Sequence, residues 1–102
     1  MTEPRLADRH VLVVGAGTQP SDDPDAPVGN GRAIAVLAAR EGAAVMCADL
    51  DRDAADETAA WIEREGGKAG VLVADVRSED DCRRLIADAG ELDGVVLNVG
   101  IG

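Results

Sequence analysis

Residues 10–17, HVLVVGAG, and residues 29–35, GNGRAIA, decide the fold that this sequence predicts. The first stretch is a short apolar run that leads directly into two glycines, and the second opens a segment with helical spacing. Glycines on both sides of a strand-to-helix turn allow a tight turn and let backbone amides approach a pyrophosphate, while the helix N-terminus attracts negative charge. Such a turn is weak evidence by itself, because glycine-rich turns also close α/β units that bind nothing.

Four short apolar runs predict four strands. Each run is continuous and rich in valine instead of alternating with polar residues, which is typical of parallel strands that helices cover on both faces. The runs are residues 11–14, 44–48, 71–74 and 95–99.

Three helices are predicted between these strands. Apolar residues at helical spacing place them at residues 31–41, 52–65 and 79–89, and a glycine follows each one. Asp51 and Ser78 are the expected N-caps of the second and third helices.

This alternation predicts an α/β fold, namely a Rossmann-like doubly wound parallel sheet of strand order 3-2-1-4, truncated to four strands and three helices. We expect two helices on one face and one on the other, which leaves the second face partly uncovered. The 102 residues form one domain, residues 1–102, expected to be incomplete at its C-terminal end. Residues 18–28, TQPSDDPDAPV, have no strand or helix period and predict an irregular loop insertion.

Composition excludes several classes of partner. The formal net charge of -10 argues against nucleic acid and against anionic membrane surfaces. No run is long and apolar enough to span a bilayer, and the opening MTEPRLADRH lacks the apolar segment of a secretory signal, so we expect a cytoplasmic protein. With 2 Cys and 1 His, the chain has too few ligands for a typical zinc site.

Asp49 strengthens the prediction of a dinucleotide site. It ends the second predicted strand, 18 residues after Gly31, close to the offset of about 20 residues expected for a carboxylate that binds an adenosine ribose. It could instead cap the next helix, but Asp51 is better placed for that role. Because Leu50 follows, no basic side chain directly after Asp49 can receive a 2′-phosphate, and this favours NAD over NADP.

Four segments together resemble the N-terminal half of a classical short-chain dehydrogenase/reductase. They are the motif at residues 29–35, the strand end Ala-Asp-Leu-Asp at 48–51, the pair Asp-Val at 75–76 and the segment Asn-Val-Gly-Ile at 98–101. The resemblance covers essentially the whole chain, in order. Each motif is short, but all four fall at successive predicted strand ends.

The resemblance implies a role for each motif. The glycine turn would hold the pyrophosphate, Asp49 the adenosine ribose, and Asp75 with Val76 the adenine. Residues 98–100 would correspond to the family's Asn-Asn-Ala-Gly motif beside the cofactor. Asp75 and Asn98 could each instead have only a structural role. The implied cofactor-binding residues are Gly15, Gly17, Gly29, Asn30, Gly31, Asp49, Leu50, Asp75, Val76, Asn98, Val99 and Gly100.

The sequence also departs from the family pattern. Val14 replaces the family's Thr before the first glycine, and Leu97 replaces the first Asn of the later motif. The segment between Gly15 and Gly29 is longer than in the family and carries three aspartates, which would repel a pyrophosphate unless the segment folds outward.

No catalytic residue is assigned to this chain. The family uses a Tyr-x-x-x-Lys pair with an upstream Ser, whereas this sequence has no Tyr, and its single Lys is Lys68. The resemblance therefore implies the cofactor-binding portion of an NAD-dependent oxidoreductase for a carbonyl or alcohol substrate, with this chain inactive alone. The alternatives are a stand-alone dinucleotide-binding or interaction module without catalysis, and a structural domain whose motifs have decayed. We also expect homo-oligomers or self-association through the exposed edge of the fourth strand.

Overall fold

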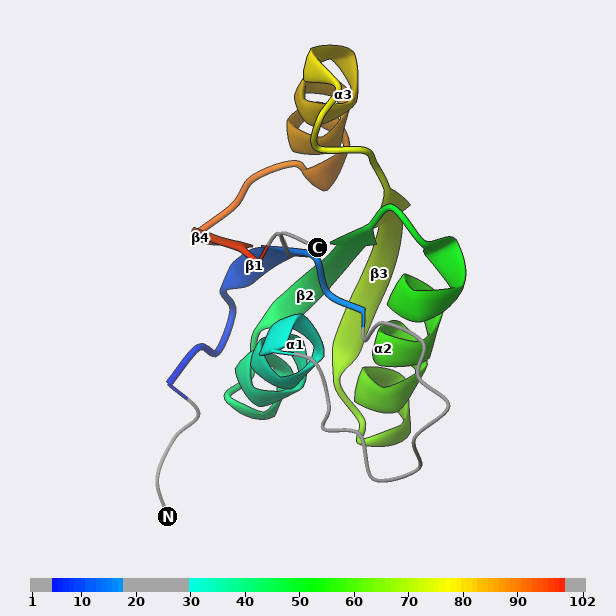
Figure 1. Cartoon of the computed structure of the whole chain (residues 1–102). Helices are drawn as coiled ribbons and strands as arrows, with labels where there is room; N and C mark the ends of the chain where they lie inside the picture. The colour runs from blue at the N-terminus through cyan, green and yellow to red at the C-terminus, as the bar shows by residue number, and fades with distance from the viewer. Residues whose placement is uncertain (1–4, 18–29, 99–102) are drawn as a thin grey trace.

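The computed structural model describes residues 5–17 and 30–98. It contains one parallel sheet, and the helices pack against the faces of that sheet (Figure 1). Its strand order is β3-β2-β1-β4, as the sequence predicts. The strands are β1 (His10–Val14), β2 (Ala44–Asp49), β3 (Lys68–Val73) and β4 (Gly94–Leu97), and the helices are α1 (Asn30–Arg40), α2 (Arg52–Arg64) and α3 (Glu79–Ala89).

The helix ends follow the local sequence. The Asp51 side chain accepts hydrogen bonds from the backbone of Asp53 and Ala54 at the start of α2, and the Ser78 hydroxyl accepts one from Asp81 at the start of α3. Gly42 ends the turn after α1 with a φ of 100°, a conformation that favours glycine. Both predicted N-caps are therefore confirmed.

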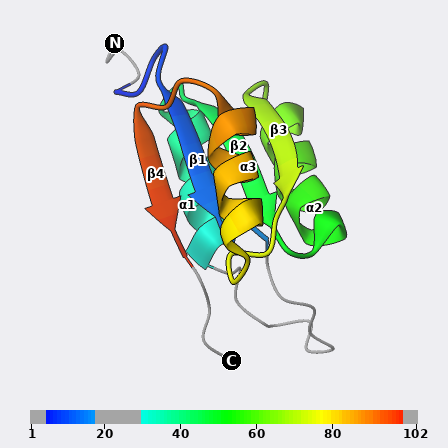
Figure 2. The ribbon, with the colours of Figure 1, turned by 90° about the horizontal axis from the view of Figure 1, so that it is seen from above.

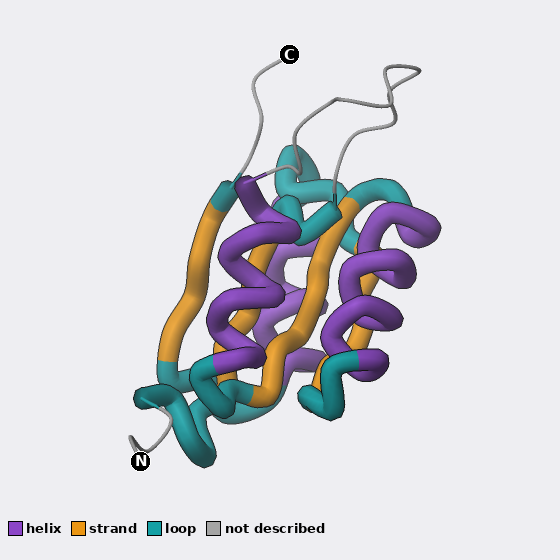
Figure 3. Tube along the Cα trace, turned by 90° about the horizontal axis from the view of Figure 1, so that it is seen from below, coloured by secondary structure: helices purple, strands orange, loops and turns teal. Residues whose placement is uncertain are grey.

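The two faces of the sheet are covered unequally. Helices α1 and α2 lie side by side on one face (Figure 3), where they bury alternate residues of the central strands such as Val13, Val45 and Cys47. Helix α3 lies on the opposite face (Figure 2), where Leu85 packs with Leu12 and Val14. Burial of one such side chain contributes about 1.5–3 kcal/mol, so both faces stabilise the central strands.

Strand β4 is covered on one face only, as expected from the partly uncovered second face of the sheet. Val95 and Leu97 point to the α3 face and are 47% and 71% exposed, whereas Val96 packs against the α1–α2 face. The cause is visible in Figure 2, where α3 does not cover β4.

Several strand boundaries differ from the prediction, most of all in β3 and β4. Strand β3 begins at Lys68 instead of residue 71, because Lys68 already pairs with Ala44. Strand β4 ends at Leu97, after pairing with β1 from Val11 to Val14. Residue 99, predicted to end this strand, and the predicted loop at residues 18–28 lie outside the described residues.

Candidate functional site

The turn after β1 is anchored to the end of β2. The backbone amides of Gly15 and Ala16 both donate to the carbonyl oxygen of Ala48, at 2.8 and 3.1 Å. Gly15 has a φ of 81°, which L side chains rarely adopt. The sequence Gly-Ala-Gly thus forms a tight turn over the carboxyl edge of the sheet, where ligands of doubly wound folds bind.

The start of α1 packs directly against this turn. A Cβ atom at Gly31 would overlap the carbonyl oxygen of Gly15, and one at Gly15 would overlap the carbonyl oxygen of Asn98. The Asn98 side chain also lies near the Gly15 carbonyl, with Nδ2 at a weak 3.5 Å. Three segments therefore meet closely at positions where only glycine fits.

Helix α1 is also the helix whose first turn carries no acidic residue. Asp53 lies in the first turn of α2, and α3 has three acidic residues there. Because a helix N-terminus attracts anions, acidic side chains in the first turn occupy that position in α2 and α3. The first turn of α1 is thus the one suited to an external anion such as a phosphate group.

Asp49 lies beside the turn and is held by backbone amides. Its Oδ2 accepts from the amide of Gly17 at 2.9 Å, and its Oδ1 accepts from the amide of Asp51 at 3.0 Å. A carboxylate oxygen can accept two hydrogen bonds, so each oxygen keeps the capacity for one more. Leu50, directly after Asp49, is 60% exposed and has no charge to offer a 2′-phosphate. Arg52 is 73% exposed and forms a long ion pair of 3.8 Å with Asp56.

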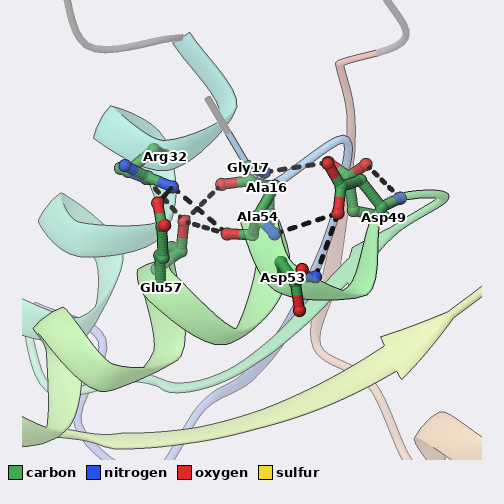
Figure 4. A network of polar contacts seen from close by, with 9 residues as sticks. Ala16, Gly17, Arg32, Asp49, Asp53, Ala54 and Glu57 are labelled. Atoms are coloured by element: carbon green, nitrogen blue, oxygen red, sulfur yellow. Dashed lines mark hydrogen bonds and ion pairs between the residues drawn. The ribbon is translucent and has the colours of Figure 1, made fainter. Parts of the chain in front are cut away.

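A second set of contacts joins the turn to α1 and α2 (Figure 4). The Thr58 hydroxyl lies 2.8 Å from the carbonyl oxygen of Ala16, and Arg32 Nε donates to the same hydroxyl at 2.8 Å. Arg32 Nη2 donates further to the Ala54 carbonyl and to Glu57. Neither Thr58 nor Arg32 is among the residues predicted from the sequence. The hydroxyl of Thr58 on the apolar stripe of α2 is a signal that could have indicated a buried partner.

Asp75 lies after β3, the next strand of the sheet, and is held differently. Both of its carboxylate oxygens accept from the Arg77 side chain, at 3.0 and 3.1 Å, and Oδ1 also accepts from the Arg77 amide. These bonds from the side chain and then the backbone of Arg77 lower the pKa of Asp75 below its ordinary value. Cys82 donates to the Val76 carbonyl at 3.4 Å, so this loop is tied to α3.

The structure brings most of the predicted site residues to one edge of the sheet. Gly15, Gly17, Gly31, Asp49 and Asn98 are linked through the contacts described above. Asn30 and Leu50 are exposed at the start of α1 and after β2, while Asp75 and Val76 follow β3. Gly29, Val99 and Gly100 lie outside the described residues.

These residues fit a dinucleotide. The amides of Gly15, Ala16 and Gly17 already donate to Ala48 and Asp49, so backbone donors for a pyrophosphate must come from the start of α1, where Gly31 packs against Gly15 with no room for a side chain. Asp49 retains acceptor capacity for ribose hydroxyls. Two carboxylates thus follow neighbouring parallel strands at the edge where the turn lies.

A shallow cavity of about 250 Å³ lies at the opposite strand ends, lined in part by His10 and Lys68. Among the described residues, no group of metal-binding side chains comes together, and none of the helices is long and apolar enough to cross a bilayer. Cys47 and Cys82 are both free thiols, and burial raises the pKa of Cys47 to about 11.

Comparison with known proteins gives consistent matches over this fold. The family model described as enoyl-(acyl carrier protein) reductase matches residues 27–102. Cyclopentanol dehydrogenase of Comamonas testosteroni is 34% identical over 101 residues, which cover 95% of this chain and 36% of that protein.

Solved structures agree with these sequence matches. A hydroxysteroid dehydrogenase from Escherichia coli is 30% identical with a TM-score of 0.81, over 97% of this chain and 40% of that chain. A short-chain type dehydrogenase/reductase from Mycobacterium marinum is 31% identical with a TM-score of 0.81, over 94% of this chain and 36% of that chain. The chain thus spans well under half of the length of each of these relatives.

Proposed function

The chain belongs to the short-chain dehydrogenase/reductase family of oxidoreductases, and from this premise we propose that it is the cofactor-binding portion of an NAD-dependent enzyme. The proposed reaction of the whole protein is hydride transfer between the nicotinamide and the reacting carbon of a carbonyl or alcohol substrate. NADP is the less favoured cofactor.

One observation carries the proposal. The Gly15–Gly31 contact, too close for any side chain, lies at the same edge of the sheet as an Asp49 carboxylate that keeps unused acceptor capacity. The contact suits a pyrophosphate and the carboxylate suits a ribose, and the two groups are adjacent in a dinucleotide.

Each residue would then have a defined task. The turn with Gly15, Gly17 and Gly31, together with Asn30 and the proposed Gly29, would hold the pyrophosphate. Asp49 with Leu50 would bind the adenosine ribose, Asp75 with Val76 would contact the adenine, and Asn98 with Val99 and Gly100 would lie beside the cofactor.

When bound, a nicotinamide dinucleotide supplies the hydride chemistry, and the protein supplies binding, orientation and exclusion of water. This chain has no Tyr to move the proton that accompanies the hydride. We therefore propose that the chain alone binds the cofactor without turnover. The second candidate is a stand-alone dinucleotide-binding or interaction module without catalysis.

The cellular setting is part of the same proposal. Two free thiols suit a reducing compartment, so a cytoplasmic location is proposed, with neither nucleic acid nor membrane as a partner.

The exposed Val95 and Leu97 on edge strand β4 favour self-association. Analytical ultracentrifugation should therefore show dimers or larger species, and a monomer at high concentration would contradict this part.

Calorimetric titration of NAD and NADP tests the binding proposal. We expect NAD to bind more tightly than NADP. Gly31→Ala should abolish binding, because the added methyl overlaps the Gly15 carbonyl. Gly94→Ala is the matched control, since a Cβ there meets no atom within 4 Å, and it should bind as the wild type does.

The titration tests dinucleotide binding, which both candidates require, and an assay of hydride transfer separates them. No binding of either dinucleotide by a folded wild-type chain would refute the proposed function. Binding by the chain, with hydride transfer in a longer form of the protein that contains a Tyr-x-x-x-Lys pair, would support the enzyme over the module.

A further inference from the structure

One peptide unit in the glycine turn is held at both ends. The carbonyl oxygen of Ala16 faces the Thr58 hydroxyl at 2.8 Å, and the amide of Gly17 donates to Asp49 Oδ2 at 2.9 Å. These two groups belong to the same planar unit, so they cannot rotate independently. We name this arrangement the peptide clamp: the Ala16–Gly17 peptide, the Thr58 hydroxyl and the Asp49 carboxylate. Figure 4 shows Gly17 beside Asp49.

Arg32 fixes the direction of the hydrogen bond from Thr58. A guanidinium only donates, so Arg32 Nε obliges the Thr58 oxygen to accept at 2.8 Å. The single hydroxyl proton then points to a carbonyl, and Ala16 at 2.8 Å is nearer than Ala54 at 3.3 Å. The Thr58 side chain is fully buried and the Arg32 side chain is 13% exposed, so water competes little for these bonds.

A flipped peptide would break both ends of the clamp. The Ala16 carbonyl oxygen would turn from the Thr58 hydroxyl toward the Asp49 carboxylate, which would lose its donor and face a second acceptor. Thr58 therefore acts on Asp49 without touching it, through the rigid peptide between them.

Simple docking of α1 on α2 does not require this arrangement. Arg40 of α1 already pairs with Glu65 beyond α2, through bonds of 2.8 and 2.7 Å that do not involve the turn. Only the Arg32–Thr58 contact continues into the Ala16 carbonyl.

We propose that Thr58, oriented by Arg32, sets the Ala16–Gly17 peptide so that its amide aligns the Asp49 carboxylate for the two ribose hydroxyls of adenosine. Thr58 and Arg32 are thus positioning residues for the cofactor. The ribose part of this inference rests on the proposed function, whereas the peptide clamp itself does not.

Amide hydrogen exchange, followed by NMR in the chain without cofactor, tests the peptide clamp directly. Thr58→Val keeps the side-chain shape but removes the hydroxyl, so the Gly17 amide should exchange about fivefold faster, as expected for loss of a bond worth about 1 kcal/mol. Thr58→Ser should restore the wild-type rate. The Asp51 amide, which donates to the other Asp49 oxygen, is the internal reference and should stay protected.

Cofactor affinity tests the consequence for Asp49. Thr58→Val should bind NAD about fivefold more weakly and discriminate less against NADP, with recovery in Thr58→Ser. Arg40→Met is the matched control: it removes the other α1 ion pair and should leave both NAD affinity and Gly17 exchange unchanged. An equal loss in Arg40→Met would overturn the proposal in favour of general helix docking.

Other outcomes are equally decisive. Unchanged Gly17 exchange in a folded Thr58→Val variant would overturn the peptide clamp. If that variant does not fold, Arg32→Met decides, because it keeps the hydroxyl but removes the donor that directs it; faster Gly17 exchange supports the proposal and an unchanged rate overturns it. A wild-type chain that binds no dinucleotide would refute the proposed function and the ribose role, while the exchange data would still decide the clamp.

Discussion

Asp49 and Asp75 follow neighbouring parallel strands, yet the protein holds the two carboxylates in different ways. Asp49 accepts from the amide of Gly17, 32 residues earlier in the chain, and that amide belongs to a peptide anchored by buried Thr58. Asp75 is held by Arg77, two residues later in the same loop, in an ion pair whose Arg77 side chain is 80% exposed.

Because of this difference, the Asp49 carboxylate is held rigidly, whereas the Asp75 carboxylate can change its position. Backbone amides of a tight turn cannot move without rearranging β1, α1 and α2, so the Asp49 carboxylate is held in a fixed position for the proposed ribose. An exposed arginine can leave its carboxylate at small cost, since surface ion pairs typically contribute 0–1 kcal/mol. The ribose end of the proposed site is therefore rigid and the adenine end can adapt.

The largest expected effect on cofactor affinity comes from a substitution of Asp49, at the rigid end of the proposed site. Asp49→Asn should lower NAD affinity about 10- to 100-fold, because an amide cannot accept from both backbone amides and also bind two ribose hydroxyls, and bonds to a charged acceptor contribute about 1.5–3 kcal/mol each. NADP affinity should fall less. Calorimetry measures both ligands.

Asp53→Asn is the control for this change. Asp53 is an exposed residue of the first turn of α2, so its substitution removes the same charge close to the site but no proposed ligand contact. Equal losses of affinity in the two variants would mean that Asp49 acts only through general charge.

A smaller effect on cofactor affinity is expected from a substitution of Arg77, which holds Asp75 at the adenine end of the proposed site. Arg77→Gln should change NAD affinity by no more than about threefold, in line with the weak contribution of an exposed pair. The pKa of Asp75 should rise toward its ordinary value of 3.8, because its main hydrogen-bonding partner is lost. NMR titration of the carboxylate measures this shift, and a tenfold change in affinity would show that Asp75 is fixed in the same sense as Asp49.

The smallest effect concerns an exposed ion pair outside the site. Hydrogen bonds from Arg40 and then from Trp61 lower the pKa of Glu65 from 4.5 to about 2. Because the folded-state value lies below the unfolded one, this pair stabilises the fold above about pH 4.5 and the contribution is lost as the pH falls toward 2.

In Arg40→Met, the free energy of unfolding should therefore decrease less steeply as the pH falls from about 4.5 to 2. NAD binding at neutral pH should stay unchanged. Urea unfolding at several pH values measures the slope. An unchanged pH dependence would show that the pair does not contribute in solution.

Sequence reasoning reached the sheet and the rigid carboxylate for physical reasons. Valine-rich runs between glycine-punctuated helices leave few alternatives to a parallel sheet. The doubly wound pattern favours the strand order 3-2-1-4, and right-handed crossovers determine the face on which each helix lies. Asp49 was identifiable because it ends a strand at a set distance from Gly31.

The contacts that hold the carboxylates were not predictable in the same way. The Thr58–Ala16 bond joins residues 42 positions apart and depends on the rotation of α2 about its axis, which a periodic pattern fixes only coarsely. The early start of β3 at Lys68 depends likewise on its register with Ala44.

Chemical-shift mapping of the ¹⁵N-labelled chain during NAD titration tests the central claim most directly. The account predicts saturable shifts at Gly15, Gly17, Gly31, Asp49 and Leu50, with smaller ones at Val76. Shifts confined to the opposite strand ends, near His10 and Lys68, or no shifts at millimolar NAD, would contradict it.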